Sequence, residues 1–168
     1  TRCSRDWSSD VCSSDLPNRL EVVREYVEQG GGFAMIGGYL SFAGIDGKAR
    51  YADTAVDEIL PVKIMNFDDR VEKPEGITPV TTEEGHPMMQ GIGAWPHFLG
   101  HNRTTLRPEG RLLASVGKDP FVAVRLVGKG RTAAFASDCA PHWGPKEFVE
   151  WANYPLFWSR FFGWLCGE

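Results

Sequence analysis

The sequence predicts an α/β fold in which helices cover a central, mainly parallel β-sheet. A helical pattern ends at the glycine triplet Gly30-Gly31-Gly32 and is followed at once by an apolar run, Phe33–Ile36. A helix joined by glycines to a strand is one αβ unit of a parallel sheet. The run has no polar residue, which is typical of a strand covered on both faces.

Length and composition limit the function classes. A chain of 168 residues that is 42% hydrophobic and 24% charged is sufficient for one domain with a sizeable core. A net charge of −4 and the lack of a basic stripe argue against nucleic acid as a partner. No apolar run is long enough to span a bilayer, so no membrane partner is expected. Four cysteines without close pairing do not form a disulfide framework, and we expect a cytoplasmic location.

The N-terminal residues 1–16 are excluded from the predicted domain. From Asp6 to Asp15 they resemble an in-frame translation of a common sequencing-library adapter, and the alternative is a polar tail rich in Ser and Asp. Cys3 and Cys12 are excluded with them. The domain then covers residues 17–168, and the adapter interpretation implies that its N-terminal strands are missing.

The first half of the domain carries clear start and stop signals. Asn18 can cap a helix that runs to the glycine triplet, and after the strand at 33–36 the segment Tyr39–Phe42 can begin a short helix. Asp53 or Thr54 can cap a second helix that ends at Leu60. A strand is expected at 62–65, and a charged loop at 68–76.

The second half begins with weaker signals and ends with strong ones. Strands are expected at 77–80, 98–101 and 111–116, with a brief helix at 83–90. Segments 121–127 and 131–137 flank Gly128-Lys129-Gly130, which predicts a hairpin with a three-residue loop. Helices follow at 146–151 and 155–166, and the last is apolar on nearly all sides and should be largely buried.

The best candidate for a site is the turn after the strand at 33–36. In open α/β sheets ligands bind beyond the carboxyl ends of the strands, and Gly37 and Gly38 let another group approach the backbone closely. A second turn, which carries Asp138 and His142, follows the apolar segment 133–136. Because parallel strands place their carboxyl ends on one side, we expect these two turns to lie close together.

Several stretches carry a resemblance to a known family. They are Tyr26–Phe42, Leu60-Pro61-Val62, Asp68–Glu72, Asp119-Pro120, Gly128–Arg131 and Ser137–Gly144. The sequence resembles the bacterial putative glutamine amidotransferase family, in the class I glutamine amidotransferase-like superfamily near the ThuA-like proteins. The resemblance covers essentially all of residues 17–168. It implies a flavodoxin-like three-layer sandwich whose first strands lie in the missing segment.

The family resemblance does not bring the usual glutaminase residues with it. A class I glutaminase presents a Cys on a sharp strand-to-helix turn and activates it with a His followed two residues later by an acid. The corresponding turn here, Gly37-Gly38-Tyr39, has no Cys, and Gly144 stands two residues after His142. We therefore expect no glutamine hydrolysis by the thioester route, and weak activation of His142. Cys139 follows the late strand, where a small buried thiol is the common alternative.

The remaining candidates each have a structural alternative. His142 can be a general base or ligand contact, or a histidine bound to a backbone carbonyl; Asp138 can orient it or cap a turn. Tyr39, Ser41 and Trp143 can line the same cleft, although Tyr39 can equally belong to the core.

A metal site is not favoured, and no cofactor is expected. The segment Asp68–Glu72 is acidic enough to suggest metal ligands, but a solvated loop of salt bridges explains it better because no nearby histidine completes a ligand set. His86, His97 and His101 are scattered without ligand spacing.

Two function classes stay open. One is an enzyme with altered chemistry that acts on a small polar metabolite, and the other is a non-catalytic domain that binds a ligand or docks a partner. In both, the expected partner is a small-molecule ligand, and a homo-oligomer is compatible with the sequence. His142, Asp138 and the Gly37 and Gly38 amides converging on one point would favour the enzyme.

Overall fold

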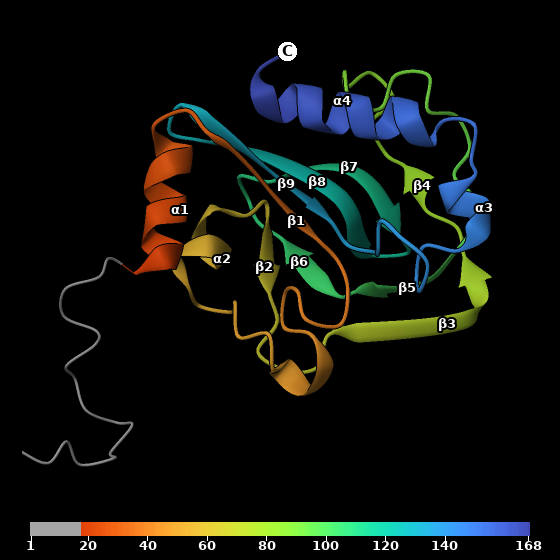
Figure 1. Cartoon of the computed structure of the whole chain (residues 1–168), viewed down its shortest axis with the longest axis horizontal. Helices are drawn as coiled ribbons and strands as arrows, with labels where there is room; N and C mark the ends of the chain where they lie inside the picture. Colours follow the sequence, from red (N-terminus) through yellow and green to blue (C-terminus); the bar gives the residue numbers. More distant parts are fainter. Residues whose placement is uncertain (1–17) are drawn as a thin grey trace, which may run out of the picture.

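A computed structural model describes residues 18–168, so the tail assigned to residues 1–16 lies outside the described residues. The main sheet has five strands in the order β1-β9-β8-β7-β4 (Figure 1). Their bounds are β1 Gly32–Ile36, β9 Gly130–Phe135, β8 Asp119–Val127, β7 Arg111–Val116 and β4 Val80–Thr81. Within residues 18–168, β1 pairs only with β9 and forms one edge of this sheet.

The expectation of a mainly parallel sheet is wrong for the described residues. β1 and β9 are parallel, but the pairs β9–β8, β8–β7 and β7–β4 are antiparallel. For β7–β8 and β8–β9 the cause is connection length, because only two residues separate the strands and a parallel pair needs a crossover of a dozen or more. Val127 pairs with Gly130, so the β8–β9 hairpin loop is Gly128-Lys129, one residue shorter than expected. The fold is therefore α/β with a mixed sheet.

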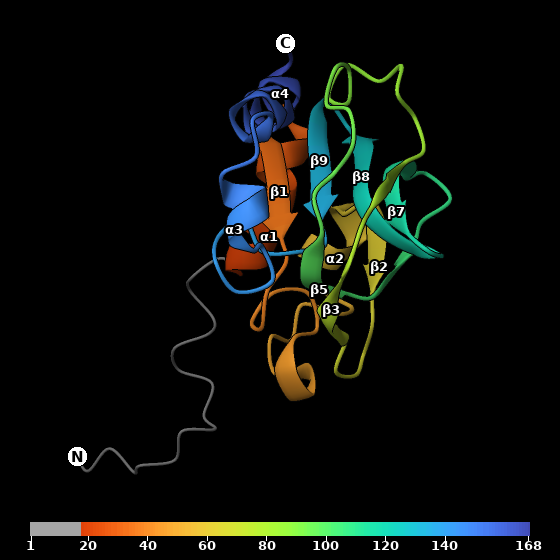
Figure 2. The same ribbon diagram turned by 90° about the vertical axis from the view of Figure 1, so that its right-hand side faces the viewer.

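Helices cover both faces of the sheet (Figures 1 and 2). Ala133 and Phe135 of β9 belong to an apolar cluster with α3 (Lys146–Val149) and α4 (Tyr154–Cys166). Ala134, between them, belongs to a second cluster, against which α1 (Arg19–Glu28) and α2 (Ala55–Ile59) pack. Because successive side chains of a strand point to opposite faces, the two clusters lie on opposite sides of the sheet.

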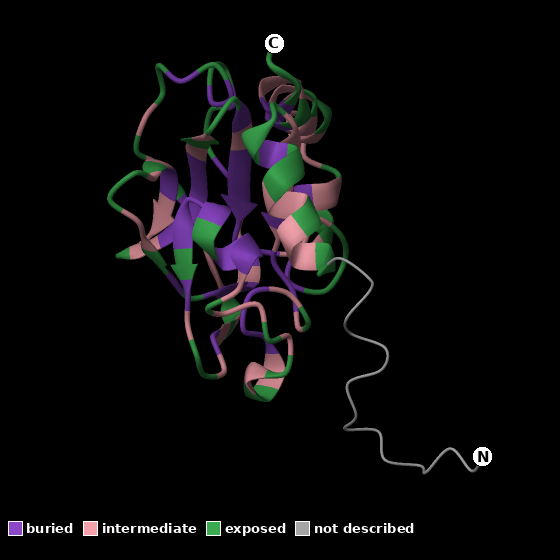
Figure 3. Ribbon diagram, turned by 90° about the vertical axis from the view of Figure 1, so that its left-hand side faces the viewer, coloured by how far each residue is buried: buried purple, intermediate pink, exposed green. Residues whose placement is uncertain are grey.

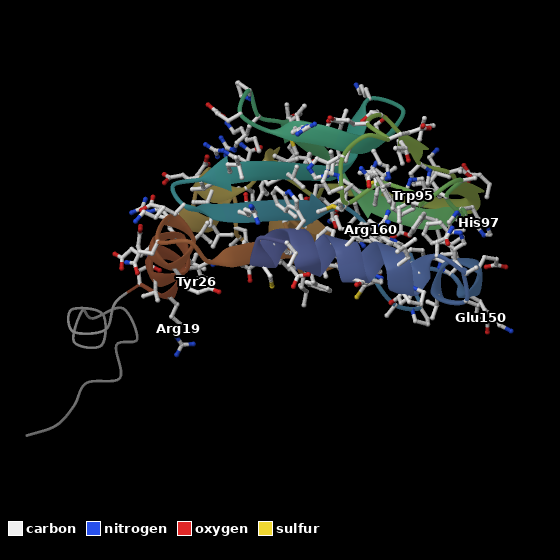
Figure 4. All side chains as sticks on the ribbon, turned by 90° about the horizontal axis from the view of Figure 1, so that it is seen from above. Arg19, Tyr26, Trp95, His97, Glu150 and Arg160 are labelled. Carbon is white, nitrogen blue, oxygen red and sulfur yellow. The ribbon has the colours of Figure 1, made fainter. Side chains whose placement is uncertain are left out.

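The α4 side holds most of the aromatic core. Its fully buried rings are Phe98, Phe121, Phe135, Phe148, Phe157 and Phe161. Figure 3 shows burial concentrated in the central strands, and Figure 4 looks down on α4 lying along the sheet. Trp95 belongs to the apolar cluster on this side. The expectation for α4 holds in part, since Phe162 on its outer side is 48% exposed.

The expected helix boundaries are close to the observed ones because the end signals are local. The Asn18 side chain accepts a hydrogen bond from the Leu20 amide, and Thr54 accepts one from the Asp57 amide. In α4, Pro155 stands in the first turn, and Gly167 ends the helix with φ 96°.

Two expected helices are not formed. Residues 39–42 make a turn in which Phe42 has φ 52°, because the Asp69 carboxylate binds the Ala43 and Gly44 amides and fixes the chain there. Residues 83–90 form successive turns. After the first of these segments a short 3-10 turn, Ile45–Gly47, follows.

The charged segment at 68–76 was expected to be a loop, and most of it is a strand. β3 (Arg70–Ile77) pairs antiparallel with β5 (Phe98–Asn102), and the register shifts between Glu72 and Ile77, where Pro74 stands. A two-stranded ribbon can tolerate a proline at such an irregularity. A second small sheet joins β2 (Val62–Ile64) to β6 (Thr104–Leu106), a strand too short to be recognised in the sequence.

Candidate functional site

The turns after β1 and β9 meet at one end of the main sheet. The Gly37 amide donates to the carbonyl of Phe135 at 2.8 Å, so the two chains are still paired where the strands end. A Cβ on Gly37 would lie 2.6 Å from the Ala136 backbone, and one on Gly38, whose φ is +146°, would lie 2.8 Å from Asp138 Oδ1. Both glycines are therefore needed for the close approach of the two turns.

His142 and Asp138 form a hydrogen-bonded pair. His142 Nδ1 lies 2.7 Å from Asp138 Oδ2, which also accepts from the Trp143 amide at 3.2 Å. A carboxylate at Nδ1 holds the proton of a neutral imidazole on that nitrogen and leaves the Nε2 lone pair free. The His142 side chain is 45% exposed. The expectation that His142 is weakly activated was based on the lack of an acid at position 144. Asp138, which the sequence offered as the residue that can orient His142, places a carboxylate at Nδ1, and the degree of activation stays a prediction.

Two rings, those of Tyr39 and Trp143, pack against His142 of this pair. The Tyr39 and His142 rings meet edge to face with centroids 4.5 Å apart, and the His142 and Trp143 rings stack at 5.6 Å. Tyr39 and Trp143 are 5.5 Å apart. Tyr39 therefore belongs to this cluster and not to either apolar core cluster.

Glu72 and Arg70 reach the cluster from β3. The Tyr39 hydroxyl donates to Glu72 Oε1 at 2.5 Å, and the Arg70 guanidinium lies 4.6 Å from the Tyr39 ring centroid. The hydrogen bond to Glu72 raises the pKa of Tyr39, so the phenol stays protonated. Asp68 binds Arg70 through two hydrogen bonds, and this contact holds the pKa of Asp68 well below its usual range.

A buried polar network lies beneath the Gly38 turn. Asn102, fully buried, accepts from the Gly38 amide at 2.9 Å and donates to the Gly38 carbonyl at 3.1 Å and to Asp69 Oδ1 at 2.8 Å. Burial raises the pKa of Asp69, while bonds from Asn102, Ala43 and Gly44 oppose that shift. The Gly37 and Gly38 amides are both engaged, so neither is free to bind an oxyanion.

The other sequence candidates contribute less. The Ser41 hydroxyl is directed at the Gly38 carbonyl, 3.4 Å away. Cys139 is half-buried, and its carbonyl accepts a hydrogen bond from Tyr154. His101 is buried against Asp119 at 3.0 Å, and burial lowers the pKa of its imidazole. Among residues 18–168 no group of three His, Cys, Asp or Glu side chains is arranged to hold a metal ion.

Four residues that contact the Gly38 turn or the rings of Tyr39 and Trp143 were not identified from the sequence. Asp69, Arg70 and Glu72 lie in the charged segment that was interpreted as a solvated loop. The charges were evident in the sequence, but the residues that they contact were not. Asn102 gave no signal, because its role depends on a contact with Gly38 across 64 residues. The largest hollow described, about 670 Å³ beside β4, is lined by residues from Thr78 to Trp95 and shares none with this cluster.

The comparisons with known proteins assign the family. A family model described as putative glutamine amidotransferase matches residues 7–167. The chain belongs to this family. The match includes residues 7–16 of the tail that the sequence analysis excluded. A search of curated proteins finds no match to this amidotransferase-like chain.

Solved structures agree with this assignment. The cytoplasmic protein STM3548 of Salmonella typhimurium has 43% sequence identity and a TM-score of 0.86, and the cytoplasmic protein STM1381 of Salmonella typhimurium LT2 has 41% and 0.86. Each comparison covers 89% of this chain and 61% of the other, so the chain spans about three-fifths of the length of these relatives. A ThuA-like protein of Bacteroides uniformis, at 15% identity and a TM-score of 0.59 over 89% of this chain and 64% of that one, shares the fold. Within residues 18–168, no helix combines the length and apolarity that crossing a bilayer requires.

Proposed function

We propose that this amidotransferase-like domain binds and acts on a small polar metabolite at the cluster formed by Tyr39, Glu72, Asp138, His142 and Trp143. His142 serves as the base or hydrogen-bond acceptor through Nε2, and Asp138 orients it. The single observation that carries the proposal is the 2.7 Å contact between His142 Nδ1 and Asp138 Oδ2 on a half-exposed ring. The Nδ1–H tautomer that this contact favours leaves Nε2 as the basic nitrogen of a half-exposed side chain.

The proposed chemistry excludes the usual glutaminase route. The turn Gly37-Gly38-Tyr39 carries no thiol, and thioester formation needs a nucleophile about 3–3.5 Å from the carboxamide carbon. The Gly38 amide, which a tetrahedral intermediate would need as an oxyanion donor, is bound to Asn102. Proton transfer or ligand recognition by His142 requires neither group.

The proposal is tested by a ligand screen in which the NMR signals of the His142 ring report binding. The protein is exposed to a panel of small amides, amino acids, polyols and sugars while the His142 ring signals are followed by NMR. A ligand of this site shifts those signals, and H142A or D138N weakens its binding. H97Q is the matched control, because His97 is similarly exposed but lies outside the cluster. Binding unaffected by H142A and D138N would contradict the proposal.

A non-catalytic domain on the same fold is the second candidate. The observation that favours it is the engagement of both Gly37 and Gly38 amides, which leaves the turn without the donors that would stabilise an anionic intermediate. A ligand that binds at His142 and is recovered unchanged after long incubation would favour this candidate. Conversion of that ligand, abolished by H142A, would favour the enzyme.

We also propose a cytoplasmic location, as in the names of the two Salmonella relatives. The finer description of the fold as a flavodoxin-like sandwich rests on the family assignment and on the helices that cover both sheet faces.

A further inference from the structure

Glu72 joins the two turns of the site from a third element. It stands on β3, outside both turns, and each of its carboxylate oxygens accepts one hydrogen bond. Oε1 accepts from the Tyr39 hydroxyl at 2.5 Å, and Oε2 accepts from the Trp143 indole at 3.2 Å. Tyr39 follows β1 and Trp143 follows β9, so one side chain connects segments about a hundred residues apart in the sequence.

The fold makes room for this connection. Gly100 on β5 is the partner of Glu72 in the β3–β5 register. A Cβ on Gly100 would lie 2.5 Å from the indole nitrogen of Trp143. Because Gly100 has no side chain, the buried indole of Trp143 can pass over β5 and reach the Glu72 carboxylate on β3. The Trp143 carbonyl is held too, because it accepts from the Leu99 amide at 2.9 Å.

The two rings bound to Glu72 are the two that contact His142. The Tyr39 ring meets His142 at 4.5 Å and Trp143 stacks on it at 5.6 Å. Tyr39 is held at a second point by Arg70, which projects from β3 onto its ring face. With both rings fixed, the imidazole has little freedom to turn away from Asp138.

We propose that Glu72 is a positioning residue of the site: it holds Tyr39 and Trp143, and through their rings keeps His142 oriented on Asp138 with Nε2 toward the ligand. This role rests on the proposed function, in which Nε2 of His142 is the working atom. Glu72 was interpreted from the sequence as part of a solvated charged loop.

The substitution that isolates this role is Glu72→Gln. A carboxylate offers an acceptor to each of the two donors, whereas a carboxamide offers one oxygen and one NH₂ group. Glu72→Gln therefore either leaves the Trp143 indole, which can only donate, facing the NH₂ group, or turns the Tyr39 hydroxyl into an acceptor. In both cases the charge that strengthens the two contacts is lost. Glu72 is solvent-exposed, so the change leaves the core intact. The matched control is Glu75→Gln on the same strand, since Glu75 is exposed and its ion pair is with Lys73 at 3.5 Å.

The readout is the rate at which diethyl pyrocarbonate modifies His142, measured by peptide mass spectrometry. The reagent attacks the free nitrogen of a neutral imidazole, so the rate reports the Nε2 that Asp138 supports. His97, which is half-exposed and outside the cluster, gives the reference rate in the same sample. His86 and His101 are buried, and their modification would reveal unfolding.

We expect Glu72→Gln to slow modification of His142 relative to His97 by roughly threefold to tenfold, as for residues coupled through shared contacts. Asp138→Asn slows it at least as much, and Glu75→Gln leaves it unchanged. Tyr39→Phe removes the same hydroxyl contact, so adding Glu72→Gln to it has a smaller effect than in the native chain. The unfolding midpoint of Glu72→Gln stays close to that of the control.

The outcomes separate the two hypotheses. If Asp138→Asn slows the reaction and Glu72→Gln does not, the positioning role of Glu72 is overturned and the proposed function stands. If neither variant changes the rate, Asp138 does not support Nε2 of His142, and both hypotheses fail. A Glu72→Gln effect that appears only together with modification of His86 and His101 reflects unfolding and also overturns the positioning role.

Discussion

Replacing Asn102 by alanine tests the buried network under the Gly38 turn. Asn102→Ala removes three hydrogen bonds at once: one accepted from the Gly38 amide, one donated to the Gly38 carbonyl and one donated to Asp69. All three lie in a buried setting, and the Asn102 side chain itself has no exposed area. Solvent therefore cannot replace the lost partners without opening the turn.

The expected cost follows from these contacts. Each lost bond contributes about 1 kcal/mol, and leaving the Gly38 amide buried without an acceptor adds about 1 kcal/mol or more. The sum, about 4 kcal/mol, is a large share of the roughly 5–15 kcal/mol by which a domain of ordinary stability is folded. Urea unfolding followed by circular dichroism measures the change as a shift of the midpoint at constant slope.

Asn66→Ala is the matched control. Asn66 is exposed, and its side chain makes no hydrogen bond to the other described residues, so its replacement should change the free energy of unfolding by less than about 0.5 kcal/mol. If Asn102→Ala costs no more than Asn66→Ala, the Gly38 amide is not engaged as described. The Gly38 amide would then be free to act as an oxyanion donor.

Three further results are expected. Arg70→Gln should return the pKa of Asp68 toward its ordinary value of 3.8. In the native chain the lowered pKa of Asp68 stabilises the fold at pH values above its ordinary pKa, and this stability is lost as the pH falls. The variant should therefore lose less stability than the native chain between pH 5 and more acidic conditions, as measured by urea unfolding and NMR titration. Gly100→Ala should displace the Trp143 indole, with a cost of about 1–3 kcal/mol and a changed tryptophan emission; unchanged emission would contradict the passage of the indole over Gly100. Phe135→Ala, at the centre of the aromatic core, should cost about 3–5 kcal/mol in the same unfolding assay, and a loss below about 1 kcal/mol would mean that the core is not packed as described.

Local signals made much of the fold predictable. The caps at Asn18 and Thr54, the glycine triplet and the uniformly apolar segments gave helix and strand positions close to those observed. The direction of the strands was harder, because apolar runs look alike in parallel and antiparallel sheets. The short loop at Gly128-Lys129 and the turn before Asp119 carried the correct information, since neither can make a crossover.

The site was predictable where it depends on strand ends and not where it depends on long-range contacts. Gly37, Gly38 and His142 each follow an apolar strand, so their meeting could be inferred from topology. Asn102 and Glu72 belong to the β3–β5 ribbon. The strand at 98–101 was expected, but its partner β3 was not, because Pro74 and a run of charges favour a loop. Their contacts form only when β3 and β5 pair.

We propose that this domain keeps the amidotransferase family fold without thioester chemistry. The most direct measurement is labelling with a glutamine-derived chloromethyl ketone, followed by peptide mass spectrometry and an assay of ammonia released from glutamine. We expect no adduct on Cys139 and no ammonia beyond that formed with Cys139→Ser. A stoichiometric adduct on Cys139, with ammonia release abolished by Cys139→Ser, would contradict it and would identify Cys139 as the nucleophile.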